Sequence, residues 1–110
     1  MLTFSTHENL VFHDRNPYAE PLVVNKEGRI LRFMLKPGQS VVEHTAPNSP
    51  VYIMVIQGTG RFLGGEGQEA RLGPGSLLVF ESNEPHAIHA EEESLVFVVF
   101  LHGAPIAQQE

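Results

Sequence analysis

Apolar residues along this chain gather in short runs that glycine and proline separate. Two of these runs, Val51–Ile56 and Leu95–Leu101, are apolar at every position. No stretch of eleven residues follows the 3.6-residue period of a helix, and short runs bounded by turn residues are typical of β-strands. We therefore predict an all-β fold of about eight to ten strands. The remaining strands are expected at Leu22–Asn25, Arg29–Lys36, Ser40–Thr45, Arg61–Leu63, Glu69–Leu72, Ser76–Phe80 and His86–Ala90.

The pattern indicates one domain over residues 1–110, because no linker or shift in composition divides the chain. Residues 1–21 have mixed polarity and predict an N-terminal arm with a short strand at Asn9–His13. Residues 22–102 are expected to form the core, and residues 103–110 a frayed tail.

The two fully apolar runs need cover on both faces. In a two-sheet sandwich, packing between the sheets buries only the inner face of each strand. The outer faces of Val51–Ile56 and Leu95–Leu101 would otherwise leave an apolar surface in water. We expect the N-terminal arm to cover one of them and a second copy of the chain to cover the other, which predicts a homodimer.

Charge and cysteine content narrow the function classes. The formal net charge is −6, so the chain lacks the cationic surface that binds nucleic acid or an anionic membrane. Both apolar runs are too short to cross a bilayer as helices. There is no cysteine, which excludes disulfides and thiolate chemistry, and the N-terminal residues do not resemble a secretory signal. A cytoplasmic location is the expectation.

Strand alternation places one histidine of each half of the chain on an inner face. Residues two apart on a strand point to the same side, so inward rows run from His44 and from His86. Side chains that converge from neighbouring strands into a barrel mouth commonly form a ligand site. The predicted pocket is lined by His44, Ala46, Val51, Ile53, His86 and Ile88.

Both histidines also stand at fixed distances from glycines. Gly38 precedes His44 with five residues between them, and Gly58 follows; Gly75 precedes His86 with ten residues between them. This spacing, within residues 29–101, resembles the paired motifs of the cupins, and in particular the small single-domain conserved-barrel members. The resemblance implies a double-stranded β-helix, or jelly-roll, barrel.

The chain departs from the typical cupin pattern at its polar positions. The resemblance implies a second histidine and a glutamate in the first motif, where this chain has Ala46 and Val51. In the second motif, proline, glycine and asparagine are replaced by Glu81, Asn83 and Ala90. Of the three histidines and one glutamate that hold the metal in a typical cupin, only two histidines remain.

A divalent metal (Zn, Fe, Mn or Ni) would therefore rest on His44 and His86, with His102 as the one plausible additional ligand. Protein metal sites of this kind usually use at least three protein ligands. The sequence thus favours a site that holds no metal tightly. Each histidine alone could equally be a buried neutral residue bonded to a backbone carbonyl.

Three functions follow from these observations. The leading hypothesis is a small-molecule-binding barrel in which His44 and His86 orient the ligand. The second is a metal-dependent enzyme of the oxygenase or isomerase type, as the resemblance implies. The third is a non-catalytic dimeric interaction module. The identity of the ligand and the existence of a reaction do not follow from the sequence, and no catalytic residue is assigned.

Overall fold

A computed structural model describes residues 1–103 of the chain, and within them nine strands account for nearly all regular structure. Their bounds are β1 (Tyr18–Asn25), β2 (Gly28–Leu35), β3 (Ser40–His44), β4 (Val51–Gln57), β5 (Gly60–Leu63), β6 (Glu69–Leu72), β7 (Leu77–Phe80), β8 (His86–Ala90) and β9 (Leu95–His102). One short 3-10 turn, η1 (Gly65–Gly67), joins β5 to β6. The predicted all-β class is confirmed. No helix in residues 1–103 is long and apolar enough to cross a membrane.

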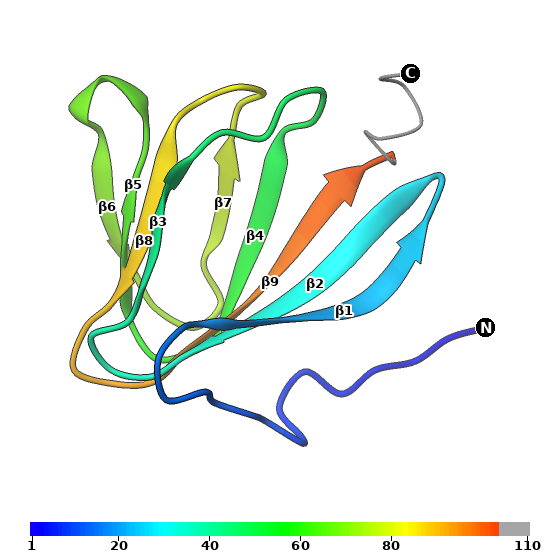
Figure 1. Ribbon diagram of the computed structural model, residues 1–110, viewed down its shortest axis with the longest axis horizontal. Helices are drawn as coiled ribbons and strands as arrows, with labels where there is room; N and C mark the ends of the chain where they lie inside the picture. Colours follow the sequence, from blue (N-terminus) through cyan, green and yellow to red (C-terminus); the bar gives the residue numbers. More distant parts are fainter. Residues whose placement is uncertain (104–110) are drawn as a thin grey trace.

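The strands form two antiparallel sheets that face each other (Figure 1). The larger has the order β1-β2-β9-β4-β7 and the smaller the order β3-β8-β5-β6. Chain neighbours often lie in different sheets: β3 belongs to the smaller sheet, β4 to the larger and β5 again to the smaller. The two histidine-bearing strands, β3 and β8, are therefore neighbours although about forty residues separate them, and both face the large sheet.

The core lies between the two sheets. The inward side chains of β4 and β9, which include Ile53, Val55 and Phe97, are almost fully buried against Phe62 and Ile88 of the smaller sheet. The fully apolar runs recognised in the sequence thus supply the centre of the larger sheet, since β9 pairs with both β2 and β4.

The turn after β4 requires glycine at position 58. Its φ is +77°, a conformation that L side chains rarely adopt. A Cβ there would lie 2.0 Å from the carbonyl oxygen of Ser94. The turn carries the chain from the larger sheet to β5 in the smaller one, and it leaves no room for a side chain beside Ser94.

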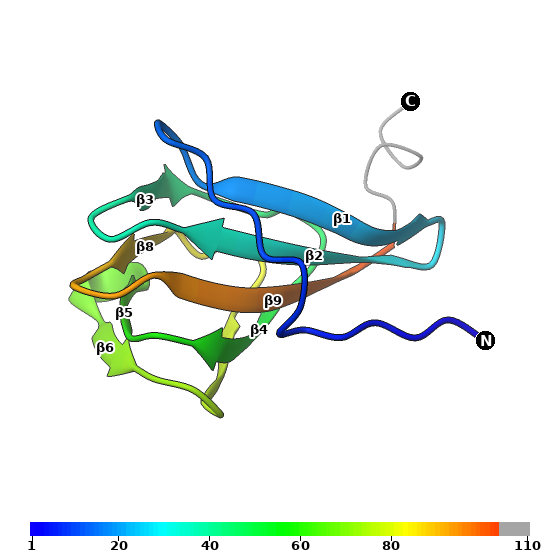
Figure 2. The same cartoon turned by 90° about the horizontal axis from the view of Figure 1, so that it is seen from below.

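The N-terminal arm crosses the outer face of β2 and β9 (Figure 2). Arg32 of β2 is only 3% exposed, and its guanidinium donates to four backbone carbonyl oxygens of the arm. Beneath the arm, Met34, Val96 and Val98 are buried on this outer face. This agrees with the expectation that the arm would cover one apolar run, in this case the first half of β9.

One predicted element in the arm is wrong. Asn9–His13 forms no strand, and β1 instead begins at Tyr18, inside the stretch assigned to the arm. Pro21 does not prevent this, because β1 is an edge strand on which a missing N–H can be tolerated, and the pairing register shifts directly after it. The predicted frayed tail falls largely on residues 104–110, outside the described residues.

Part of the outer face stays uncovered. Tyr52 and Met54 of β4, Leu77 and Val79 of β7, and Phe100 of β9 are between 36% and 72% exposed. Their strands are neighbours in the order β9-β4-β7, and the pairing puts Phe100 beside Tyr52 and Tyr52 beside Val79. We call these five residues the outer patch.

Candidate functional site

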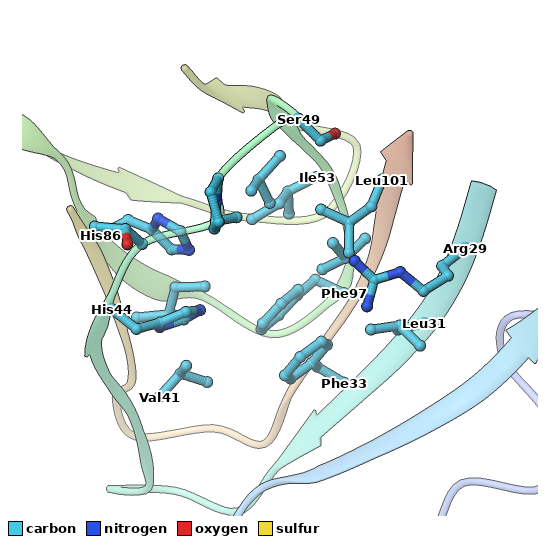
Figure 3. Close-up of a pocket in the computed structure, with 16 residues that line it drawn as sticks. Arg29, Leu31, Phe33, Val41, His44, Ser49, Ile53, His86, Phe97 and Leu101 are labelled. Atoms are coloured by element: carbon cyan, nitrogen blue, oxygen red, sulfur yellow. The ribbon is translucent and has the colours of Figure 1, made fainter. Parts of the chain in front are cut away.

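A cavity of about 310 Å³ opens between the two sheets (Figure 3). Its wall on the larger sheet is mainly apolar, with side chains from β2, β4 and β9, and its wall on the smaller sheet carries the two histidines. The lining residues are Arg29, Leu31, Phe33, Val41, His44, Thr45, Ala46, Pro47, Ser49, Val51, Ile53, His86, Ile88, Phe97, Val99 and Leu101. All six residues predicted from the sequence to line a pocket are among them.

His44 and His86 meet directly across two paired strands. They are register partners of β3 and β8, and their ring centroids are 4.3 Å apart. Between Val41 and His44 the register shifts by one residue, so three steps along β3 match two along β8. This β-bulge lets both Val41 and His44 face the cavity although they are three residues apart, and bulges commonly re-aim side chains next to functional sites.

The backbone fixes the same tautomer in both rings. His44 Nδ1 lies 2.9 Å from the carbonyl oxygen of Val42, and His86 Nδ1 lies 2.9 Å from that of Glu84. A carbonyl only accepts, so each neutral ring carries its proton on Nδ1 and donates it there. Each Nε2 is left with a lone pair, and no group in residues 1–103 hydrogen-bonds to either one. The cavity therefore contains two hydrogen-bond acceptors side by side.

The environment of His86 favours its neutral form. The residue is 4% exposed and its ring stacks on Phe80, with centroids 4.6 Å apart. Burial is the largest influence on His86 and lowers its pKa; the hydrogen bond to the Glu84 carbonyl is next in size and opposes this, and the nearby His44 lowers the pKa further. His44 stands at the exposed edge of the cavity. The pair thus combines one buried imidazole with one open to solvent.

The third predicted metal ligand is not brought to this pair. The Nε2 of His102 lies 3.0 Å from the hydroxyl of Tyr52, on the outer side of the larger sheet. Residues 1–103 contain no group of three or more histidine, aspartate or glutamate side chains placed to hold a metal. Two Nε2 atoms alone do not make a tight site, so a metal here would need a further ligand from a bound molecule or from outside the described residues.

The prediction from sequence missed Arg29. It lies in β2, in phase with Leu31 and Phe33, and all three line the cavity. The signal was present in the sequence, because an arginine that alternates with buried apolar residues shares their inward face. Ser49 was also missed. Its hydroxyl donates to the Pro50 carbonyl and accepts from the His102 N–H, so it bonds the loop between β3 and β4 to the end of β9.

Comparison with known proteins identifies the family to which this architecture belongs. The family model described as Cupin domain matches residues 31–101, about two thirds of the chain. The chain belongs to the cupin family. This confirms the resemblance seen in the glycine and histidine spacing. A search of curated proteins found no match.

Solved structures confirm the double-stranded β-helix fold of this cupin. A protein of Thermus thermophilus matches with a TM-score of 0.87 at 19% identity, covering 94% of this chain and 98% of its own. An uncharacterized conserved protein with a double-stranded β-helix domain from Klebsiella pneumoniae gives 0.84 at 20% identity, covering 92% and 89%. An RmlC-like cupin protein from Desulfovibrio desulfuricans gives 0.79 at 25% identity, covering 91% and 95%.

Proposed function

We propose that this cupin binds a small organic molecule in the barrel, with His44 and His86 orienting it. The observation that supports this most directly is the pair of free Nε2 atoms at one wall of an otherwise apolar cavity. Ligand sites typically combine apolar walls with a few converging polar groups. The apolar walls would supply most of the affinity through buried surface, and the two acceptors would select the orientation of the ligand.

The cavity volume limits the size of the ligand. A cavity of about 150 Å³ accommodates benzene, so about 310 Å³ fits a molecule of on the order of a dozen non-hydrogen atoms. A hydroxyl or amine on the ligand would donate to Nε2 of His44 or His86. This favours a compact ring or branched chain that carries a hydrogen-bond donor at one end.

A fragment screen by ligand-observed NMR and thermal shift tests the proposal. Because His44 is exposed, His44→Ala should fold normally while it weakens binding of the fragments found by about fivefold or more, the loss of one hydrogen bond. His7→Ala, the same substitution in the arm, away from the cavity, is the matched control and should bind as the wild type does. A full screen without a single binder would refute the proposal.

The metal-dependent enzyme is the alternative that the same two Nε2 atoms support. Elemental analysis of protein purified without chelator separates the two functions. A stoichiometric metal that is lost in His44→Ala would favour the enzyme, whereas less than about 0.1 metal per chain, unchanged on reconstitution, would exclude it.

A further inference from the structure

Arg29 carries a charge that the protein itself leaves uncompensated. Its side chain lines the cavity, and its Nε is buried without a hydrogen-bond partner (Figure 3). No ion pair or hydrogen bond joins its guanidinium to any residue in 1–103. Arg32, three residues along the same strand, shows the contrast: it pairs with Glu20 at 2.8 Å and donates to the arm carbonyls.

The guanidinium of Arg29 is partly buried, because its Nε is enclosed while the residue as a whole is half-buried, and this partial burial without a partner is costly. Arginine stays protonated at any pH that proteins experience, so it cannot relieve the cost by losing its proton. Burying a charge is unfavourable unless an opposite charge or hydrogen bonds compensate it. Among the described residues that line the cavity there is no aspartate or glutamate. The compensating group must therefore come from water or from a bound anion.

The geometry favours an anion at one particular end of the cavity. Figure 3 shows Arg29 on the opposite side from His44 and His86, beside Leu31 and Leu101, with Phe97 between the two ends. The cavity thus has a cation at one end, an aromatic and aliphatic middle, and two hydrogen-bond acceptors at the other end. A ligand that matches this order is negatively charged at one end, apolar in the middle and a donor at the far end.

We infer that the ligand is a small organic carboxylic acid, with its carboxylate on Arg29 and its apolar body against Phe33 and Phe97. The inference rests on the proposed binding function and adds its chemical class. A carboxylate matches the planar fork of a guanidinium with two parallel hydrogen bonds. Arg29 is the one permanent cation among the described lining residues, so a singly charged carboxylate is balanced there and a phosphate dianion is not.

Because the chain carries a net negative charge, binding of an acid would depend on Arg29 in particular. At −6 the protein repels anions in general, so uptake of an acid would depend on the local field of Arg29 inside a low-dielectric cavity. Exposed arginines such as Arg15, on the arm, lack that environment. Removal of Arg29 should therefore abolish the preference for acids, and removal of Arg15 should leave it unchanged.

Matched acid and amide pairs test the inference on the full-length chain. The probes are 4-hydroxyphenylacetate with 4-hydroxyphenylacetamide, and benzoate with benzamide, within a broader library of neutral fragments, with inorganic phosphate as a separate arm. Isothermal titration should give acids a Kd about 10- to 100-fold lower than that of their amides, as a charge-assisted bidentate contact predicts. Arg29→Met should remove this difference between acid and amide, while Arg15→Met retains it.

A measurement without ligand accompanies the titrations. Arg29→Met replaces the uncompensated charge by an apolar side chain of similar length, so its melting temperature without ligand should equal or exceed that of the wild type. A lower melting temperature would show that Arg29 is already compensated, and would overturn the inference.

The titrations have their own contradicting outcomes. Fragments that bind without any preference for acids, or acids that bind Arg29→Met equally well, would also overturn the inference while the proposed function stands. Phosphate binding tighter than that of the acids would replace carboxylate by phosphate. If nothing in the library binds, the proposed function fails and the inference fails with it.

Discussion

Glu84 connects two turns with its carboxylate, the β5–β6 turn and the β7–β8 turn, and holds His86 with its backbone carbonyl. Its Oε2 accepts from the backbone N–H of Gly65 and its Oε1 from that of Glu81, both at 2.8 Å. The backbone carbonyl oxygen of Glu84 accepts from His86 Nδ1 and so sets the tautomer of that ring. The hydrogen bonds from Gly65 and then from Glu81 lower the pKa of Glu84, because they stabilise its charged form.

Acid should therefore weaken the fold through Glu84. A carboxylate whose folded pKa is depressed contributes stability that is fully present above its ordinary pKa of about 4.5 and is lost as the pH falls through the folded value. Glu84→Gln retains one acceptor oxygen, so we expect it to lower the free energy of unfolding by about 1–2 kcal/mol at pH 7. The deficit should shrink as the pH falls below 4.5, as measured by urea titration at several pH values.

The neighbouring glutamate is the control for this prediction. Glu81→Gln alters an exposed side chain and leaves the backbone N–H that Glu84 uses, so its stability should follow that of the wild type across the pH range. A deficit of Glu84→Gln that stays constant from pH 7 to pH 3 would show that the charge on Glu84 does not stabilise the turns.

At the residue scale the sequence predicted the two histidines of the candidate site and missed its arginine. Alternation and glycine spacing identified His44 and His86, because both depend on local geometry that the sequence carries directly. The free Nε2 atoms depend on which carbonyl each ring meets, and that requires the backbone. Arg29 was missed because a charged residue in a strand is usually assigned to solvent, although its phase with Leu31 and Phe33 predicted the opposite.

At the scale of elements, the positions of the strands were largely predictable and their extent was not. Glycine or proline lies close to at least one end of every strand from β2 onward, and the polar run of residues 91–94 separates β8 from β9, so each strand could be located. The start of β1 at Tyr18 was missed because two prolines flank it, and their effect depends on whether a strand lies at an edge or in the centre of a sheet. That distinction belongs to the sheet and cannot be read from the strand alone.

The arm is the element whose attachment depends most on one residue. Arg32 donates to the carbonyl oxygens of Ser5, Thr6, Glu8 and Asn9. Arg32→Met should cost about 2–4 kcal/mol of stability, because those carbonyls and the carboxylate of Glu20 lose a buried cationic partner. In this variant the arm should exchange its amide hydrogens faster than in the wild type, while the barrel stays protected. Protease should also cut the arm before the barrel, and limited proteolysis with mass spectrometry can locate the cuts.

Arg61→Met provides the same substitution in a solvent-exposed ion pair. Arg61 and Glu69 are 3.0 Å apart with side chains 40% and 48% exposed, so the loss should lie between 0 and about 1 kcal/mol and leave the arm protected. If Arg32→Met leaves the arm as resistant to protease as the wild type, the arm is held by its apolar contacts instead.

At the scale of the whole molecule, the outer patch lies on the reverse side of the strand that lines the cavity. Val51 and Ile53 of β4 face the cavity, whereas Tyr52 and Met54 face outward. Whatever covers the patch would therefore stiffen one wall of the cavity without blocking its opening. An uncharged patch that spans three adjacent strands is typical of a surface that buries itself against a partner.

A second copy of the chain fits this patch better than water does. The two copies would be related by a twofold axis, so each patch meets its own counterpart, and the patch contains no charges that would repel across the axis. We expect sedimentation to give twice the chain mass of 12.2 kDa.

The double variant Leu77→Glu with Val79→Glu tests whether the outer patch forms the dimer. It should yield monomers, because it places like charges opposite one another. Val42→Glu alters an equally exposed apolar residue of the smaller sheet and should remain dimeric. A dimer that persists in His44→Ala, which should lose ligand affinity, would show that assembly through the larger sheet does not depend on the histidines of the smaller sheet. A wild-type monomer at high concentration would contradict the predicted dimer.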